Sequence, residues 1–104
     1  MTTPKQTYQE IIVESFRPYC TNGLHGPIHI RPLPGQGLDT HMMVECSKSL
    51  SYAHPVGALF RIRAKITSKE GGTSFVYSSY KWPVSIVSPE EAARYIQNNS
   101  PWSW

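Results

Sequence analysis

Residues 57–80 read GALFRIRAKITSKEGGTSFVYSSY, a pattern typical of two strands joined by a glycine turn. In the first arm, apolar residues alternate strictly with polar ones from Phe60 to Thr67. A period of two over eight residues indicates a half-buried strand. Gly71 and Gly72 tolerate the positive φ angles of a hairpin loop, and a β-rich run follows directly. The sequence therefore predicts a β-hairpin around which the rest of the chain is organised.

The register of this hairpin follows from its apolar residues. A four-residue loop, 69–72, places Ile66 opposite Phe75 and Arg61 opposite Tyr80, and makes one face apolar throughout. A five-residue loop would divide the apolar residues between the two faces, because a slip of one residue turns every side chain over. We therefore predict the shorter loop. This interpretation favours a core position for the aromatic residues of the second arm and its continuation, Phe75, Tyr77 and Trp82.

The other face of the predicted hairpin is cationic. It carries Arg61, Arg63 and Lys65 in a row, with Tyr80 beside them. Residues 60–82 contain five basic residues and one acidic residue, in a chain whose net charge is +3. Such a surface attracts nucleic acid, an acidic protein or small anions. Two simpler interpretations remain open: the cations only keep a solvent-facing strand from aggregating, and Tyr80 only covers Arg61 through a cation–π contact.

The length of 104 residues predicts a single domain, 1–104, with one hydrophobic core. No apolar run approaches the roughly 20 residues that span a bilayer, and the first residues lack the apolar segment of a signal peptide. We therefore expect a soluble, cytoplasmic protein that does not enter a membrane. Cys20 and Cys46 are expected to be free thiols in that compartment.

Local patterns predict the remaining elements. A short strand is expected at 28–31, and another at 40–46 with Met42, Val44 and Cys46 facing the core. Residues 8–16 fit either a strand or a helix, and we favour the strand. Pro83 marks residues 82–87 as an edge strand or a strand start. The clearest helix spans about residues 88–98: Ser88 and Glu91 form an N-terminal capping box, Pro89 takes the first helical position, and Ala92, Ala93 and Ile96 form one side.

Together these elements predict a mainly β or α+β fold. Four to six short, mostly antiparallel strands would form a strongly curled sheet or a small barrel, with one C-terminal helix packed on it. An open sheet with the helix on one face is the alternative. Residues 100–104 contain two tryptophans and are interpreted as an aromatic docking tail, either onto the body or onto a second subunit.

Few residues have the spacing of a catalytic or metal site. Cys20, His25, His29, His41 and Cys46 offer sulfur and nitrogen ligands, but their spacing is not that of a usual zinc site, and His41 and Cys46 have opposite parity on the expected strand. We therefore predict no metal and no cofactor. A cysteine nucleophile at Cys20 with His25 as its partner is the one enzymatic alternative, although no catalytic triad has a familiar spacing.

The sequence thus favours a non-catalytic binding protein. Its partner would be anionic, either single-stranded nucleic acid or an acidic protein, and would contact Arg61, Arg63, Lys65 and Tyr80. A second hypothesis is assembly: two copies of the chain would join by the edge of the sheet or by the tail, which makes a homo-oligomer the expected state.

Overall fold

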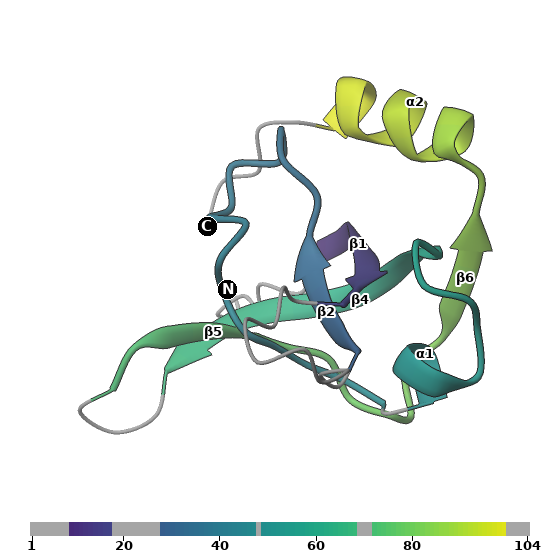
Figure 1. Cartoon of the computed structure of the whole chain (residues 1–104). Coiled ribbons are helices and arrows are strands. Elements are labelled where there is room, and N and C mark those ends of the chain that lie inside the picture. The colour runs from purple at the N-terminus through teal and green to yellow at the C-terminus, as the bar shows by residue number, and fades with distance from the viewer. Residues whose placement is uncertain (1–8, 18–27, 48, 69–71, 100–104) are drawn as a thin grey trace.

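The computed structural model describes residues 9–17, 28–47, 49–68 and 72–99, and it is mainly β with a C-terminal helix (Figure 1). This confirms the predicted fold class. No helix of the described part is long and apolar enough to cross a membrane. The elements in chain order are β1 (Gln9–Phe16), β2 (His29–Pro32), β3 (Val44–Glu45), α1 (Ser49–Tyr52), β4 (Leu59–Ser68), β5 (Ser74–Tyr77), β6 (Val84–Val87) and α2 (Pro89–Asn99).

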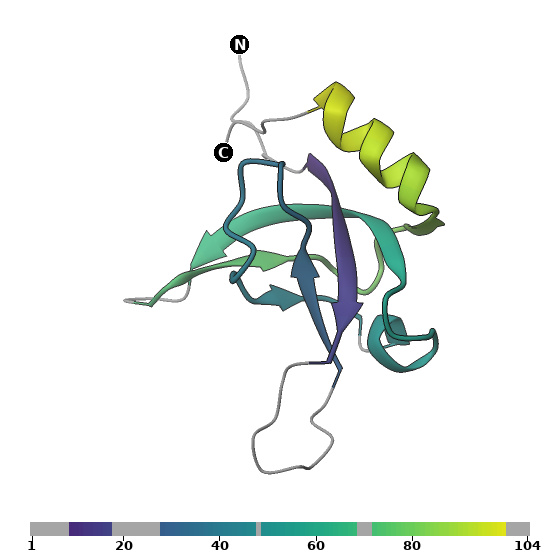
Figure 2. The ribbon, with the colours of Figure 1, turned by 45° about the horizontal axis from the view of Figure 1, so that its top comes forward.

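The strands form one nearly closed, barrel-like sheet in the order β2-β1-β4-β5-β3 (Figures 1 and 2). The long strand β4 is its centre. One side of β4 pairs with β1, while the other side pairs with β6 along its first half and with β5 along its second half. These pairs and β1–β2 are antiparallel, as expected, whereas β3 joins β5 in parallel. The strand β6 begins after Pro83 and pairs, among the described strands, with β4 alone, which confirms its predicted edge position.

The core lies on the inner face of β1 and β4. The period of two that defined β4 in the sequence places Phe60, Ile62 and Ala64 inside, where they are almost completely buried. On the outer face, Ile12 is also fully buried, on the side where α2 contacts β1, β4 and β6 (Figure 2). The buried core cluster consists of Ile11, Val13, Leu50, Phe60, Ile62, Ala64 and Val76.

The predicted register of the central hairpin is wrong by one residue. The structure pairs Ser68 with Ser74 and Ile66 with Val76, so the loop contains five residues, 69–73. The cause is a third strand that the hairpin sequence does not reveal. The backbone N–H of Val76 donates to the carbonyl oxygen of Met43 at 2.8 Å, and β3 thereby fixes which residues of β5 face inwards.

The helix α2 begins as predicted. Ser88 Oγ accepts a hydrogen bond from the Glu91 backbone N–H at 3.0 Å, and Glu91 Oε1 accepts one from the Ser88 N–H at 2.8 Å. These hydrogen bonds lower the pKa of the Glu91 carboxyl group. The predicted apolar side of the helix needs one correction, because Ala92 is buried whereas Ala93 is exposed.

The strand expected over residues 40–46 is reduced to the two residues of β3. A turn occupies its first half, because Asp39 Oδ1 accepts the His41 backbone N–H at 2.8 Å and the Asp39 carbonyl oxygen accepts the Met42 N–H at 3.1 Å. The half-buried Met42, Val44 and Cys46 nevertheless pack against the core, as predicted. The short helix α1 is not among the elements that the sequence predicts.

Candidate functional site

The first part of the outer face of β4 is occupied by α2 and by the acidic start of β1. Arg61 Nε lies 3.2 Å from Glu10 Oε1, and the Arg61 guanidinium lies 5.3 Å from the centre of the Tyr95 ring. The Tyr95 hydroxyl donates to the Glu10 carbonyl oxygen at 2.7 Å, and burial, assisted by the Glu10 carboxylate, raises the pKa of this phenol. The aromatic partner of Arg61 is therefore Tyr95, and the cation–π contact considered for Tyr80 is wrong.

Beyond α2, the outer face of β4 combines cations with aromatic rings. Arg63 is exposed and Lys65 half-buried, and the register places Lys65 opposite Tyr77. Phe75 points to the same face as Tyr77, because alternate residues of a strand share a face. The Trp82 ring packs edge-on against the Tyr77 ring, with centroids 5.8 Å apart. We call Arg63, Lys65, Phe75, Tyr77 and Trp82 the cationic–aromatic face.

This composition differs from the prediction, which favoured core positions for the aromatic residues. Phe75, Tyr77 and Trp82 are instead half-buried, and Val76 is the fully buried residue of β5. The shift of one residue moved the rings to the cationic side. Ser78 follows β5 on the same side as Val76 and is buried, and its hydroxyl is satisfied there because it donates to the Arg63 carbonyl oxygen.

The four residues predicted as a binding site do not all lie together. Arg63 and Lys65 share the open part of the face, whereas Arg61 lies beside α2. Tyr80 is 75% exposed in the turn between β5 and β6, with the Lys81 ammonium group 5.8 Å from its ring centre. It is not opposite Arg61, because that position belongs to Ser85 of β6.

Two carboxylates border the cationic–aromatic face. Glu10 is the cross-strand neighbour of Arg63, and Glu45 is the neighbour of Tyr77 on β3. Residues paired across a sheet point to the same side, so both acids lie on the outer face. The local charge is therefore less positive than the hairpin sequence indicates, and three of the five residues of the cationic–aromatic face are aromatic.

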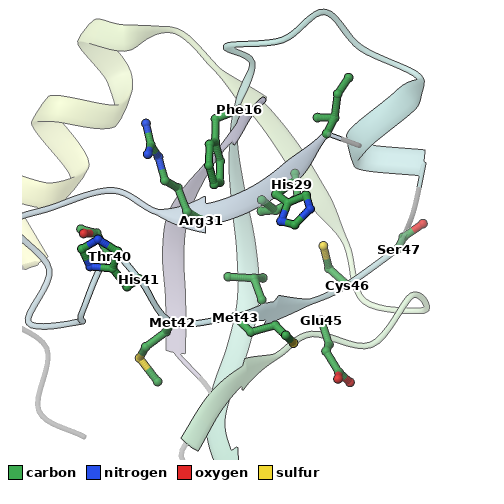
Figure 3. A pocket seen from close by; sticks show the side chains of 13 residues that line it. Phe16, His29, Arg31, Thr40, His41, Met42, Met43, Glu45, Cys46 and Ser47 are labelled. Carbon is green, nitrogen blue, oxygen red and sulfur yellow. The ribbon is translucent and has the colours of Figure 1, made fainter. Parts of the chain in front are cut away.

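A second candidate is an open groove of about 710 Å³ along the seam between β2 and β3 (Figure 3). Figure 3 shows His29 and Cys46 extending into it from opposite sides, with Met43 below them. His29 also packs edge-on against Phe16, with ring centroids 6.0 Å apart. Among the residues that the structure describes, no group of three or more His, Cys, Asp or Glu side chains could hold a metal ion.

Cys46 in this groove has the properties of a packing residue. Burial raises the pKa of its thiol to about 11, so the thiolate needed for nucleophilic attack is scarce at neutral pH.

In a Cys20→Ser chain, where Cys46 is the sole thiol, we expect alkylation by iodoacetamide to be slow at pH 7 and to accelerate up to about pH 10 and beyond. A rate that levels off near pH 8.5 would contradict this, and a denatured sample provides the reference rate.

The other predicted chemistry lies outside the described residues. This holds for Cys20 and His25, the pair considered as an enzymatic alternative, and for the aromatic tail at 100–104. Neither prediction is tested by the structure.

The fold and the site define a small, mainly β protein with a nearly closed sheet, one helix on its outer face and a cationic–aromatic face beside that helix. Comparison with models of protein families, with curated proteins and with solved structures finds no match to this chain.

Proposed function

We propose that the protein is a non-catalytic binding protein that recognises single-stranded nucleic acid through the cationic–aromatic face. The observation that carries the proposal is the register of β4 and β5, which sets Lys65 opposite Tyr77 and leaves Arg63 exposed beside them. Cations neutralise phosphates, and flat rings stack with unpaired bases. We place this activity in the cytoplasm, the compartment expected from the sequence.

The rings favour nucleic acid over an acidic protein as the partner. An acidic protein needs mainly positive charge, and here Glu10 and Glu45 reduce it. Flat, exposed bases can stack on Tyr77 or Trp82, and the contribution of such stacking is about 1–3 kcal/mol per base. Single strands fit better than duplexes because their bases are accessible.

The test is fluorescence anisotropy with a labelled single-stranded oligonucleotide at several salt concentrations. For Arg63→Glu combined with Lys65→Glu, we expect the affinity to fall by about 10- to 100-fold and the slope of log affinity against log salt to become shallower by about one per lost contact. For Tyr77→Ala, we expect a loss of about 5- to 150-fold with an unchanged salt slope. Glu45→Gln, which removes a bordering negative charge, should strengthen binding.

Arg94→Glu is the matched control, because Arg94 is an exposed cation of α2 that does not belong to the face. It should change the affinity by no more than about twofold. Equal losses from Arg94→Glu and from Arg63→Glu alone, each of which changes the net charge by two, would reduce the effect to net charge. If a poly-glutamate peptide binds as tightly as the oligonucleotide and Tyr77→Ala has no effect, the partner is an acidic polypeptide and the nucleic-acid proposal fails.

A further inference from the structure

The strand β6 presents an open edge with exposed apolar side chains. Among the described strands it pairs with β4 alone. Ile86 is 62% exposed and Val84 is 39% exposed, although both point to the same side of the sheet as their buried cross-strand neighbours on β4. An uncovered edge of this kind is a template for pairing with another strand.

The direction of the backbone groups along this edge follows from the ladder on the other side of β4. The Ser15 N–H donates to the Ala58 carbonyl oxygen at 3.0 Å, so Ala58 and every second residue after it point their backbone groups towards β1. Arg61 therefore points its groups towards β6, where its partner is Ser85. Because successive residues of a strand alternate, Val84 and Ile86 direct their N–H and C=O groups outwards.

We propose that β6 pairs with β6 of a second copy of the chain, antiparallel and across a two-fold axis. Ser85 of the two copies would lie at the axis, and Val84 of each copy would pair with Ile86 of the other. This register joins outward-pointing residues only, as an antiparallel ladder requires. It buries the exposed Val84 and Ile86 side chains against each other and joins the two sheets into one.

Charge complementarity supports a second copy of this chain as the occupant. β6 itself has no charged residue; Lys81 precedes it and Glu90 follows it, and both are exposed. In an antiparallel pair the start of one strand lies beside the end of the other, so the residues that precede β6 in one copy lie near those that follow β6 in the other. Lys81 then comes within reach of Glu90 of the second copy, twice in each dimer. A parallel arrangement would instead bring like charges together.

The dimer also extends the sheet in a defined way. Because the added strand continues the same sheet, the outer faces of both copies lie on one side, with the two α2 helices flanking the axis. The pairing surface involves neither Arg63 nor Lys65. The dimer is therefore an inference separate from the proposed nucleic-acid function and is tested without any ligand.

The experiment is sedimentation equilibrium of the full chain over a wide concentration range. We expect a monomer–dimer equilibrium, weakened at least about tenfold by Ile86→Lys, which places a charge in each Val84–Ile86 pair beside the axis. Met43→Lys is the matched control, since Met43 is 63% exposed but lies in the groove between β2 and β3. It should leave the dissociation constant unchanged.

A charge exchange tests the register. Lys81→Glu and Glu90→Lys should each weaken the dimer, and the double variant should restore it. In hydrogen exchange, the amides of Val84 and Ile86 should become protected as concentration rises, whereas Ser85 and Val87 should be protected throughout. A wild-type chain that stays monomeric, a dimer insensitive to Ile86→Lys, or assemblies larger than a dimer would overturn the proposal.

Discussion

Replacing Gln36 with leucine is expected to lower the free energy of unfolding by about 3 kcal/mol, measured by urea denaturation. Gln36 lies in the loop after β2 and is fully buried, which is rare for a glutamine. Leucine keeps most of its volume, so the loss reports hydrogen bonds and not packing. An effect below about 1 kcal/mol would contradict the role of this side chain.

The reason for this large effect is that the Gln36 amide makes hydrogen bonds to the backbone of β1 that a neighbouring strand would otherwise make. Its Oε1 accepts the Ile12 N–H at 2.7 Å, and its Nε2 donates to the carbonyl oxygens of Ile12 at 2.8 Å and Leu33 at 3.0 Å. Gly35 and Gly37 have φ angles of +94° and +80°, which side chains rarely adopt, and they turn the chain so that Gln36 reaches β1. Without the amide, the buried Ile12 N–H loses its acceptor, whereas the Ile12 carbonyl oxygen keeps the hydrogen bond from the Leu33 N–H at 3.1 Å.

Two further variants separate the contributions. Gln36→Glu keeps an acceptor for the Ile12 N–H but loses both donated hydrogen bonds and buries an acid, so we expect a loss at least as large at pH 7 and a smaller one at low pH, where the carboxyl is neutral. Gln97→Leu is the control, because Gln97 is exposed on α2 and its replacement should change stability by no more than about 0.5 kcal/mol.

The parts of the fold that were predictable depend on local signals. The alternation from Phe60 to Thr67 predicts β4, because a period of two over eight residues is typical of a half-buried strand. The capping box of Ser88 and Glu91 places the start of α2 to within a residue, because its two side chains accept hydrogen bonds from backbone N–H groups at the start of the helix. Pro83 marks β6 as an edge because proline cannot donate to a ladder.

The parts that were not predictable depend on distant partners. Gln36 occupies a loop rich in glycine and proline, and nothing in that sequence indicates that its amide pairs with β1, 24 residues earlier. The register of β5 likewise depends on β3, which lies about 30 residues before it and has only two residues. A sequence pattern indicates the period of a strand well. Which face of the strand is buried depends on its register with neighbouring strands, and these lie elsewhere in the chain.

The site likewise combines features that follow from local sequence with features that depend on distant partners. Arg63 and Lys65 were predicted to share an outer face, because their position follows from the parity of β4 alone. Their aromatic neighbours were assigned to the core, because apolar rings in an isolated hairpin favour burial. Tyr95 was missed as the partner of Arg61, since α2 reaches β4 only through the tertiary fold.

Val76→Asp should unfold the protein or lower its stability by more than about 4 kcal/mol, whereas Tyr77→Asp should cost about 1–2 kcal/mol. Val76 is completely buried among the core residues, so a carboxylate there loses its hydration without a partner. Tyr77 is half-buried on the outer face, where a carboxylate stays hydrated and faces Lys65 across the strand pair. Circular dichroism during thermal unfolding measures both variants under identical conditions.

The order of the two effects distinguishes the two possible hairpins. The register inferred from the hairpin alone buries Tyr77 opposite Ala64 and exposes Val76, so it requires Tyr77→Asp to be the more damaging change. The observed register requires the reverse. The proposed function depends on the same distinction, because only the observed register sets an aromatic ring beside Lys65. If Tyr77→Asp unfolds the chain while Val76→Asp is tolerated, the outer face keeps its cations but loses the rings on which bases would stack.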